Sequence, residues 1–183
     1  GGIKTIGWVL WTAERLKIMS KLSKTSLPKE SIINNFIKRN DYEDCYSFTV
    51  PNNNKSIREI YISLFSSAPK WVEGMMKLRN KIVRLFGLKN EMNRNENTNF
   101  GVGDKIGIFK IYAIQEDEII AGEDDKHLDF RVSIHRIIEK ETTVSISTLV
   151  QYNNWFGKLY FFVVKPFHKI VVKSLIRKAA KKI

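Results

Sequence analysis

The chain has 183 residues, 43% hydrophobic and 11% aromatic, which is enough for one sizeable core and too little for two ordinary domains. Its single cysteine, Cys45, excludes an intrachain disulfide and favours a cytoplasmic location. The net charge of +12 is most concentrated in residues 158–183, which carry eight Lys or Arg and no Asp or Glu, and this basic end suits an anionic partner.

Residues 1–18 begin without a methionine and hold an apolar run that charged residues soon interrupt. The run is too short for a transmembrane helix and lacks the cleavage site of a signal peptide. We interpret residues 1–18 as a leader or an expression-derived segment outside the domain, and residues 19–183 as a single domain. The alternative is a membrane-surface anchor built on Trp8 and Trp11.

The first predicted elements are a short helix and a strand. Apolar residues recur at helical spacing within Ile32–Ile37. From Asp44 to Val50 the pattern alternates, with Tyr46 and Phe48 on the apolar side, so we expect a half-buried strand that ends at Pro51.

Two helices are predicted after this strand. Ser56 and Glu59 have the spacing of a capping box, which starts a helix that Pro69 ends. The second helix stops near Gly87, before the asparagine-rich loop Asn90–Asn99. Its expected buried face is formed by Trp71, Met75, Leu78, Ile82 and Phe86.

The hydrophobic period changes to two after Gly103. Short charged turns separate the segments, so the strands are expected to form an antiparallel meander. The predicted strands are Lys105–Ile114, Glu118–Gly122, Leu128–Ile137 and Thr143–Tyr152. One face of this sheet is apolar and needs a cover.

The segment Asn154–Ile183 is predicted to be a long amphipathic helix that covers this face. Asn154 can cap its start, and Pro166 predicts a kink or a break in its middle. We expect Phe167 to turn inward, toward the space between the helix and the sheet, and His168 to lie near the rim of that space.

This order of elements is that of the helix-grip fold, an α+β arrangement in which a curved antiparallel sheet wraps a long C-terminal helix, with two short helices after the first strand. The chain resembles the bacterial DUF2867 family over about residues 20 to 180. The resemblance rests on motifs at Asp41–Asp44, Gly122–Ser133, Asn154–Tyr160 and Pro166–His168. It implies membership of the START and birch-pollen-allergen-like superfamily (SRPBCC) and an apolar cavity, but no settled activity.

The first functional hypothesis is a binding protein for a small hydrophobic molecule held between the sheet and the last helix. The candidate ligand-binding residues are Phe48, Phe109, Phe130, Arg131, Ile146, Thr148, Phe167 and His168. The alternative is a cavity enzyme of the cyclase or hydratase type, with His168 as the weak catalytic candidate. Arg131 is expected to pair with Asp129 or to align a ligand carboxylate.

A third hypothesis is a peripheral membrane or interaction protein that docks through its basic C-terminal helix. The three histidines lack the spacing of a metal site, and no phosphate-binding glycine loop is present, so we predict neither a metal nor a cofactor. Nucleic-acid binding is not predicted, because the aromatic residues of the strands fall on the faces expected to be buried.

Overall fold

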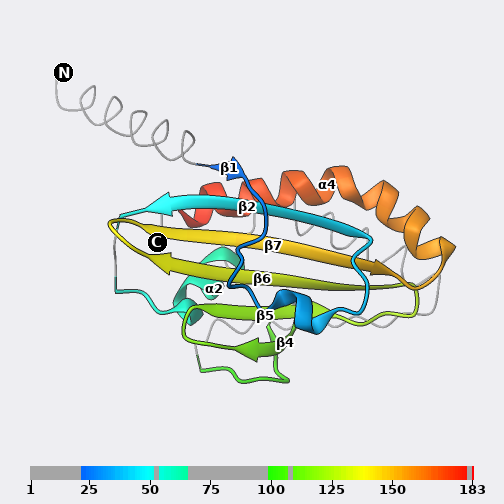
Figure 1. Ribbon diagram of the computed structural model, residues 1–183, viewed down its shortest axis with the longest axis horizontal. Coiled ribbons are helices and arrows are strands. Elements are labelled where there is room, and N and C mark those ends of the chain that lie inside the picture. The colour runs from blue at the N-terminus through cyan, green and yellow to red at the C-terminus, as the bar shows by residue number, and fades with distance from the viewer. Residues whose placement is uncertain (1–21, 52–53, 66–98, 107–108, 181–182) are drawn as a thin grey trace, which may run out of the picture.

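The computed structural model describes residues 22–51, 54–65, 99–106, 109–180 and 183. Within them the chain forms an α+β fold with a seven-stranded sheet of order β1-β2-β7-β6-β5-β4-β3, and every pairing is antiparallel (Figure 1). The strands are β1 (Ser23–Lys24), β2 (Tyr42–Val50), β3 (Lys105–Ile106), β4 (Phe109–Ile114), β5 (Glu118–Glu123), β6 (Leu128–Ile138) and β7 (Thr142–Tyr152). The helices are the 3-10 helix η1 (Ile33–Phe36), α2 (Ile57–Phe65) and α4 (Trp155–Ala179).

The central strands have the predicted alternation. β6 and β7 are the longest neighbours in the sheet, and β2 pairs with β7 along its whole length. On the apolar face the register places Phe130 opposite Val150, Val132 opposite Thr148 and Ile134 opposite Ile146. These pairs form the floor on which the helices pack.

The predicted single strand Lys105–Ile114 is wrong. β3 and β4 are two strands that pair with each other, so the chain reverses direction between Ile106 and Phe109. Apolar alternation continues on both sides of Gly107 in the sequence and therefore imitates one uninterrupted strand.

α2 begins at the predicted capping box. The backbone N–H of Ser56 donates to Glu59 Oε2 at 2.7 Å, and the amide of Glu59 donates to Ser56 Oγ at 3.3 Å. Its buried residues are Ile57, Ile60, Tyr61 and Leu64. This face joins the main core beneath α4, where α2 also packs against β5 and β6.

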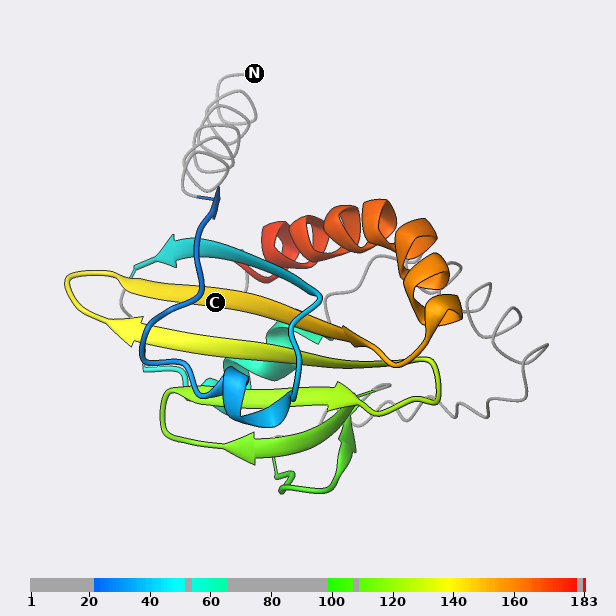
Figure 2. The same ribbon diagram turned by 45° about the vertical axis from the view of Figure 1, so that its right-hand side comes forward.

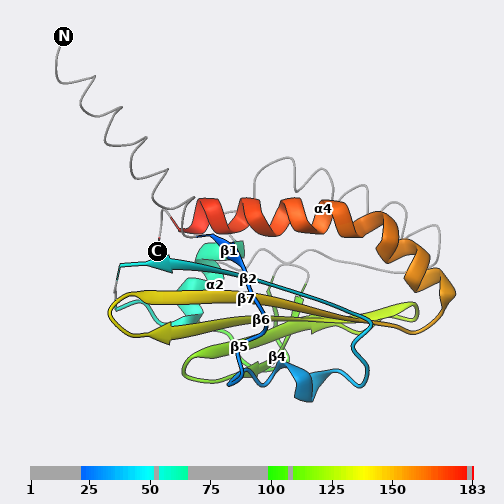
Figure 3. The same ribbon diagram turned by 45° about the horizontal axis from the view of Figure 1, so that its top comes forward.

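α4 also begins at its predicted cap, since the side chain of Asn154 accepts a hydrogen bond from the Gly157 amide at 3.0 Å. The helix runs unbroken through Pro166. Figure 3 shows that it lies along one face of the sheet and bends between its first and last turns. A bent rather than interrupted helix is one of the two outcomes predicted from the proline.

Gly157 fixes the height of α4 above the sheet. A Cβ atom at this position would lie 1.9 Å from the carbonyl oxygen of His127, so any larger residue would clash with the turn between β5 and β6. The ring of Phe156 packs on the ring of His127, with centroids 4.7 Å apart. The first turn of α4 is thereby held beside the N-terminal end of β6.

The opposite face of the sheet is also covered. The chain from β1 to η1 crosses the strands on that side, as Figures 1 and 3 show. Ile33 of η1 packs there with Ile120 and Leu149 in a second small core. Beside it, the buried carboxylate of Glu118 accepts hydrogen bonds from the hydroxyls of Ser31 and Ser133 and from the Ile32 amide.

Several predicted features lie outside the described residues. These are the segment 1–18, the second helix with Trp71, Met75, Leu78, Ile82 and Phe86, and most of the loop Asn90–Asn99. In the part of the chain that is described, no helix combines the length and the apolar character needed to cross a membrane.

Candidate functional site

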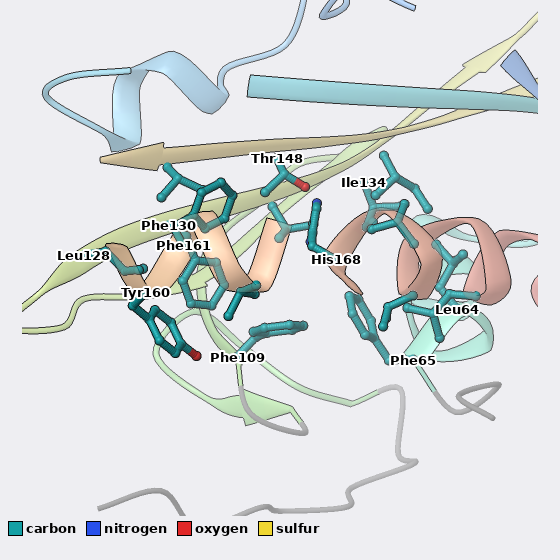
Figure 4. Close-up of a pocket in the computed structure, with 17 residues that line it drawn as sticks. Leu64, Phe65, Phe109, Leu128, Phe130, Ile134, Thr148, Tyr160, Phe161 and His168 are labelled. Atoms are coloured by element: carbon teal, nitrogen blue, oxygen red, sulfur yellow. The ribbon is translucent and has the colours of Figure 1, made fainter. Parts of the chain in front are cut away.

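A pocket of about 210 Å³ lies between α4 and the apolar face of the sheet. β6 and β7 form its floor and α4 forms one wall, while α2 and β4 contribute to the rest of its lining (Figure 4). The lining residues are Leu64, Phe65, Phe109, Leu128, Phe130, Val132, Ile134, Ile146, Thr148, Val150, Tyr160, Phe161, Val164, His168, Val171, Val172 and Leu175.

The hydrophobic periods of the strands and of α4 create this lining. On the strands every second residue faces the helix, and on α4 the spacing of three and four residues directs one side toward the sheet. On α4 the inward positions include Phe161, Val164, His168, Val172 and Leu175. The pocket is therefore a gap between two regular apolar surfaces.

Aromatic rings form one wall of the pocket. The rings of Phe65 and Phe109 meet edge to face with centroids 5.2 Å apart, and those of Phe109 and Phe130 do so at 5.5 Å. Figure 4 shows Phe65 toward one end of the pocket and Phe109 in the middle, while Phe130, Phe161 and Tyr160 lie toward the other end. Such edge-to-face contacts are a favoured geometry for aromatic rings, so this wall is well packed.

Four polar residues form what we call the polar corner: Tyr42, Asp44, Thr148 and His168. Asp44 is 3% exposed and lies 3.3 Å from His168 Nε2, and the hydroxyl of Tyr42 donates to Asp44 Oδ2 at 2.7 Å. His168 and Thr148 also line the pocket, so the corner opens into an otherwise apolar space.

The polar corner stabilises a buried negative charge. Burial by itself raises the pKa of Asp44, but the hydrogen bond and positive field of His168 and the hydroxyls of Tyr42 and Thr148 outweigh it, so the pKa lies below its usual range. Burial and the neighbouring Asp44 carboxylate raise the pKa of Tyr42, which keeps its hydroxyl protonated as a donor.

Thr148 is incompletely satisfied. It lies directly opposite Asp44 in the strand register and favours the Asp44 carboxylate, yet its buried Oγ1 has no hydrogen bond of normal geometry to any described residue. A buried hydroxyl without a partner costs about 1–3 kcal/mol.

A carboxylate beside an imidazole can hold a proton and exchange it with a molecule within hydrogen-bonding reach. Here the Asp44 carboxylate lies within hydrogen-bonding distance of Nε2 of His168, and this contact fixes the orientation of the ring at the pocket wall. The polar corner can therefore orient a polar group of a ligand, and it has the elements needed to move a proton to or from that group.

Five of the eight predicted ligand-binding residues line this pocket: Phe109, Phe130, Ile146, Thr148 and His168. Phe48 does not line it, although it faces the same side of the sheet, because it is fully enclosed in the main core.

The expected inward turn of Phe167 is wrong. This residue is 47% exposed on the outer side of α4, whereas His168 faces the sheet. The difference corresponds to a rotation of the helix by about one residue, or 100°.

Arg131 lies on the opposite face of the sheet from the pocket, because successive residues of β6 point to opposite sides. Its guanidinium lies 2.6 Å from Asp124 and stacks 3.8 Å from the centre of the Tyr112 ring. The predicted partner Asp129 instead accepts hydrogen bonds from the Asp125 amide and the Asn153 side chain. Neither the expected pairing with Asp129 nor a position beside the pocket is found.

Sequence reasoning missed Asp44 and Tyr42. The sequence did contain a signal, because Asp44 lies on the same face of β2 as the apolar residues Tyr46 and Phe48. An acidic residue at an inward-facing position requires a buried partner, and His168 was the available candidate. The pairing joins residues 124 positions apart and is visible only after the helix is placed.

Within the described ranges, no group of three or more His, Cys, Asp or Glu side chains could hold a metal ion. A comparison with protein families matches residues 36–175, more than half of the chain, to the family described as "Protein of unknown function (DUF2867)". No curated protein and no solved structure shows significant similarity to the chain.

Proposed function

The chain belongs to the DUF2867 family, and we propose that it binds a small, mostly apolar molecule in the pocket between α4 and the sheet. The observation that carries this proposal is the pocket itself, a largely apolar space whose described polar lining residues are Thr148, His168 and Tyr160. Apolar pockets with a few well-placed polar groups are the usual form of small-molecule sites.

The volume of the pocket limits the size of the ligand. An engineered apolar cavity of about 150 Å³ accepts benzene. At about 210 Å³, this pocket would hold one aromatic ring with a short substituent, or a chain of similar size. The proposed ligand is thus smaller than a long fatty acid or a sterol.

The polar corner limits the chemistry of the ligand. Thr148 and His168 place a hydroxyl-bearing side chain and the edge of an imidazole ring at the same wall of the pocket. Burying a carboxylate in this largely apolar space would be costly, and the Asp44 carboxylate already offsets the positive field of His168. The proposed ligand therefore carries one neutral hydrogen-bonding group, such as a hydroxyl or a carbonyl.

The helix-grip arrangement and placement in the SRPBCC superfamily are part of the same proposal. The antiparallel sheet with a long C-terminal helix across one face supports them, as does the pocket between the two. In Figure 2 the helix is seen to one side of the strands, at the level of β2 and β7.

Calorimetric titration with three probes of one shape tests the proposal: ethylbenzene, para-ethylphenol and para-ethylbenzoate. We expect para-ethylphenol to bind most tightly, because its hydroxyl can pair with the polar corner. Ethylbenzene should bind about tenfold more weakly, which is the effect of one hydrogen bond of about 1.4 kcal/mol. Para-ethylbenzoate should bind most weakly of the three.

A matched pair of variants locates the binding. Val164→Phe fills the pocket and should abolish binding, whereas Val163→Phe makes the same change one residue away, on the exposed side of α4, and should preserve it. If none of the probes binds to the wild-type protein, or if both variants bind them alike, ligand binding in this pocket is refuted.

A further inference from the structure

The outer side of α4 carries a row of apolar residues that face away from the sheet. Six large apolar side chains are between 47% and 76% exposed, and their spacing of one, three or four residues places them on one side of the helix. They are Trp155, Leu159, Phe162, Val163, Phe167 and Ile170, and we call them the outer stripe. Among the described residues, only Val102 and Ile138 are comparably exposed large apolar residues elsewhere.

α4 is therefore apolar on two sides. Its inner side, with Phe161, Val172 and Ile176, is buried against the sheet. The outer stripe has no corresponding role in the core, and a contiguous exposed apolar surface on a protein commonly marks an interaction site.

Basic residues accompany the outer stripe. Between Trp155 and Ala179 the helix contains six Lys or Arg residues and no Asp or Glu. Lys165 lies over the ring of Tyr42 and Lys173 over that of Tyr46, with centroid distances of 4.7 and 5.5 Å, so both extend along the side of α4 that faces β2. Positive charge thus borders the apolar row along one flank.

We propose that the outer stripe docks onto an anionic lipid surface. Helices that lie in the membrane interface combine Trp, Phe and Leu on one side with Lys and Arg beside them, and they insert the apolar side among the acyl chains. The lysines beside the stripe would lie at the level of the anionic headgroups, where each basic residue adds to binding. Complementary charge favours a lipid surface over a neutral apolar partner.

This docking would bring the pocket close to the lipid. Phe161 and Val164 line the pocket from the same turns of α4 that carry Leu159, Phe162 and Val163 on the outside. The lipid surface and the pocket would then be separated by the thickness of one helix. The docking proposal stands on the exposed side of α4 and does not depend on which molecule the pocket binds.

Vesicle sedimentation of the full chain tests the proposal. We expect binding to vesicles of phosphatidylcholine with phosphatidylserine, much weaker binding to pure phosphatidylcholine, and a loss of binding when salt rises from about 0.1 M to about 1 M. The double variant Leu159→Ser with Phe162→Ser should partition at least about tenfold less well. The double variant Lys165→Gln with Lys173→Gln should lose about fivefold for each lysine.

The double variant Val102→Ser with Ile138→Ser is the matched control, since it removes two exposed apolar residues outside α4. It should bind anionic vesicles as the wild type does. Equal binding of the Leu159/Phe162 variant and this control would overturn the proposal. The proposal also fails if the wild type is a dimer that the Leu159/Phe162 variant dissociates, because the stripe would then bind a second copy of the chain.

A third measurement excludes coverage of the stripe by the chain itself. The Leu159/Phe162 variant and the Val102/Ile138 control should unfold at similar urea concentrations, since all four of these residues are at least half exposed. A much larger loss of stability in the Leu159/Phe162 variant than in the control would show that the stripe is packed within the protein, and would overturn the proposal.

Discussion

Asp44 is a carboxylate at a position of β2 that faces the apolar side of the sheet. The strand cannot place it in water, so its charge depends on Tyr42 and His168. A buried charge whose partner is removed is strongly destabilising, whereas the intact pair contributes a net benefit that depends on pH. Asp44 therefore couples the pocket wall to the stability of the whole fold.

The lowered pKa of Asp44 predicts the pH range in which this contribution disappears. Because its folded-state pKa lies below the unfolded-state value of about 3.9, the stabilisation is fully present above that value and is lost as pH falls through the folded-state pKa. Urea denaturation from about pH 7 to about pH 3 should show this loss in the wild type and a smaller one in Asp44→Asn.

Glu43→Gln removes an exposed carboxylate from the same strand and controls for the change in net charge. Asp44→Asn should also be less stable than the wild type at neutral pH by about 1–3 kcal/mol, because Tyr42 and His168 lose a charged partner. Parallel pH profiles for the wild type and Asp44→Asn would contradict the assignment of the pair.

At the scale of one element, some features of α4 could be predicted from the sequence and one could not. Its start at Asn154, its amphipathic character and the effect of Pro166 follow from local chemistry, and the structure agrees with them. Its rotation about its own axis could not be predicted in the same way. Both sides of the helix are apolar, so hydrophobic periodicity alone does not distinguish the side with Phe167 from the side with His168.

A pair of isoleucines tests this rotation. Ile176 is 1% exposed and Ile170 is 56% exposed, although they lie less than two turns apart on α4. Ile176→Ala should lower the free energy of unfolding by about 2–5 kcal/mol, because it leaves a cavity in the core. Ile170→Ala should change it by about 0.5 kcal/mol or less. Equal losses in urea denaturation would mean that α4 is rotated differently from the structure described above.

At the scale of the whole molecule, the sheet is buried on both faces. From the sequence, a cover was predicted for one face only, namely the helix after β7. The apolar run Ile119–Ala121 in β5 was the available signal, since a strand buried on both sides reads as continuous rather than alternating. The covering segment precedes β2, and its contacts with β5 and β7 join distant parts of the chain that local patterns do not connect.

The pocket follows from the same long-range assembly. Sequence periodicity was sufficient to place Phe130, Ile146 and Thr148 on the face toward α4, where they line it. It could not show that Phe48 is sealed in the core, because that depends on how α2 and the end of α4 pack above it. A pocket is the space that packing leaves unfilled, and residue patterns describe only the packed surfaces.

A methyl-detected NMR titration of the full chain with para-ethylphenol tests the central claim most directly. Val132, Ile134 and Ile146 line the pocket, while Ile120 and Leu149 belong to the small core on the opposite face of the sheet. We predict saturable shifts of the first three methyl signals, with the signals of the other two unchanged. Shifts that are strongest for Ile120 and Leu149, or no saturable shift of the pocket methyl groups, would contradict ligand binding between α4 and the sheet.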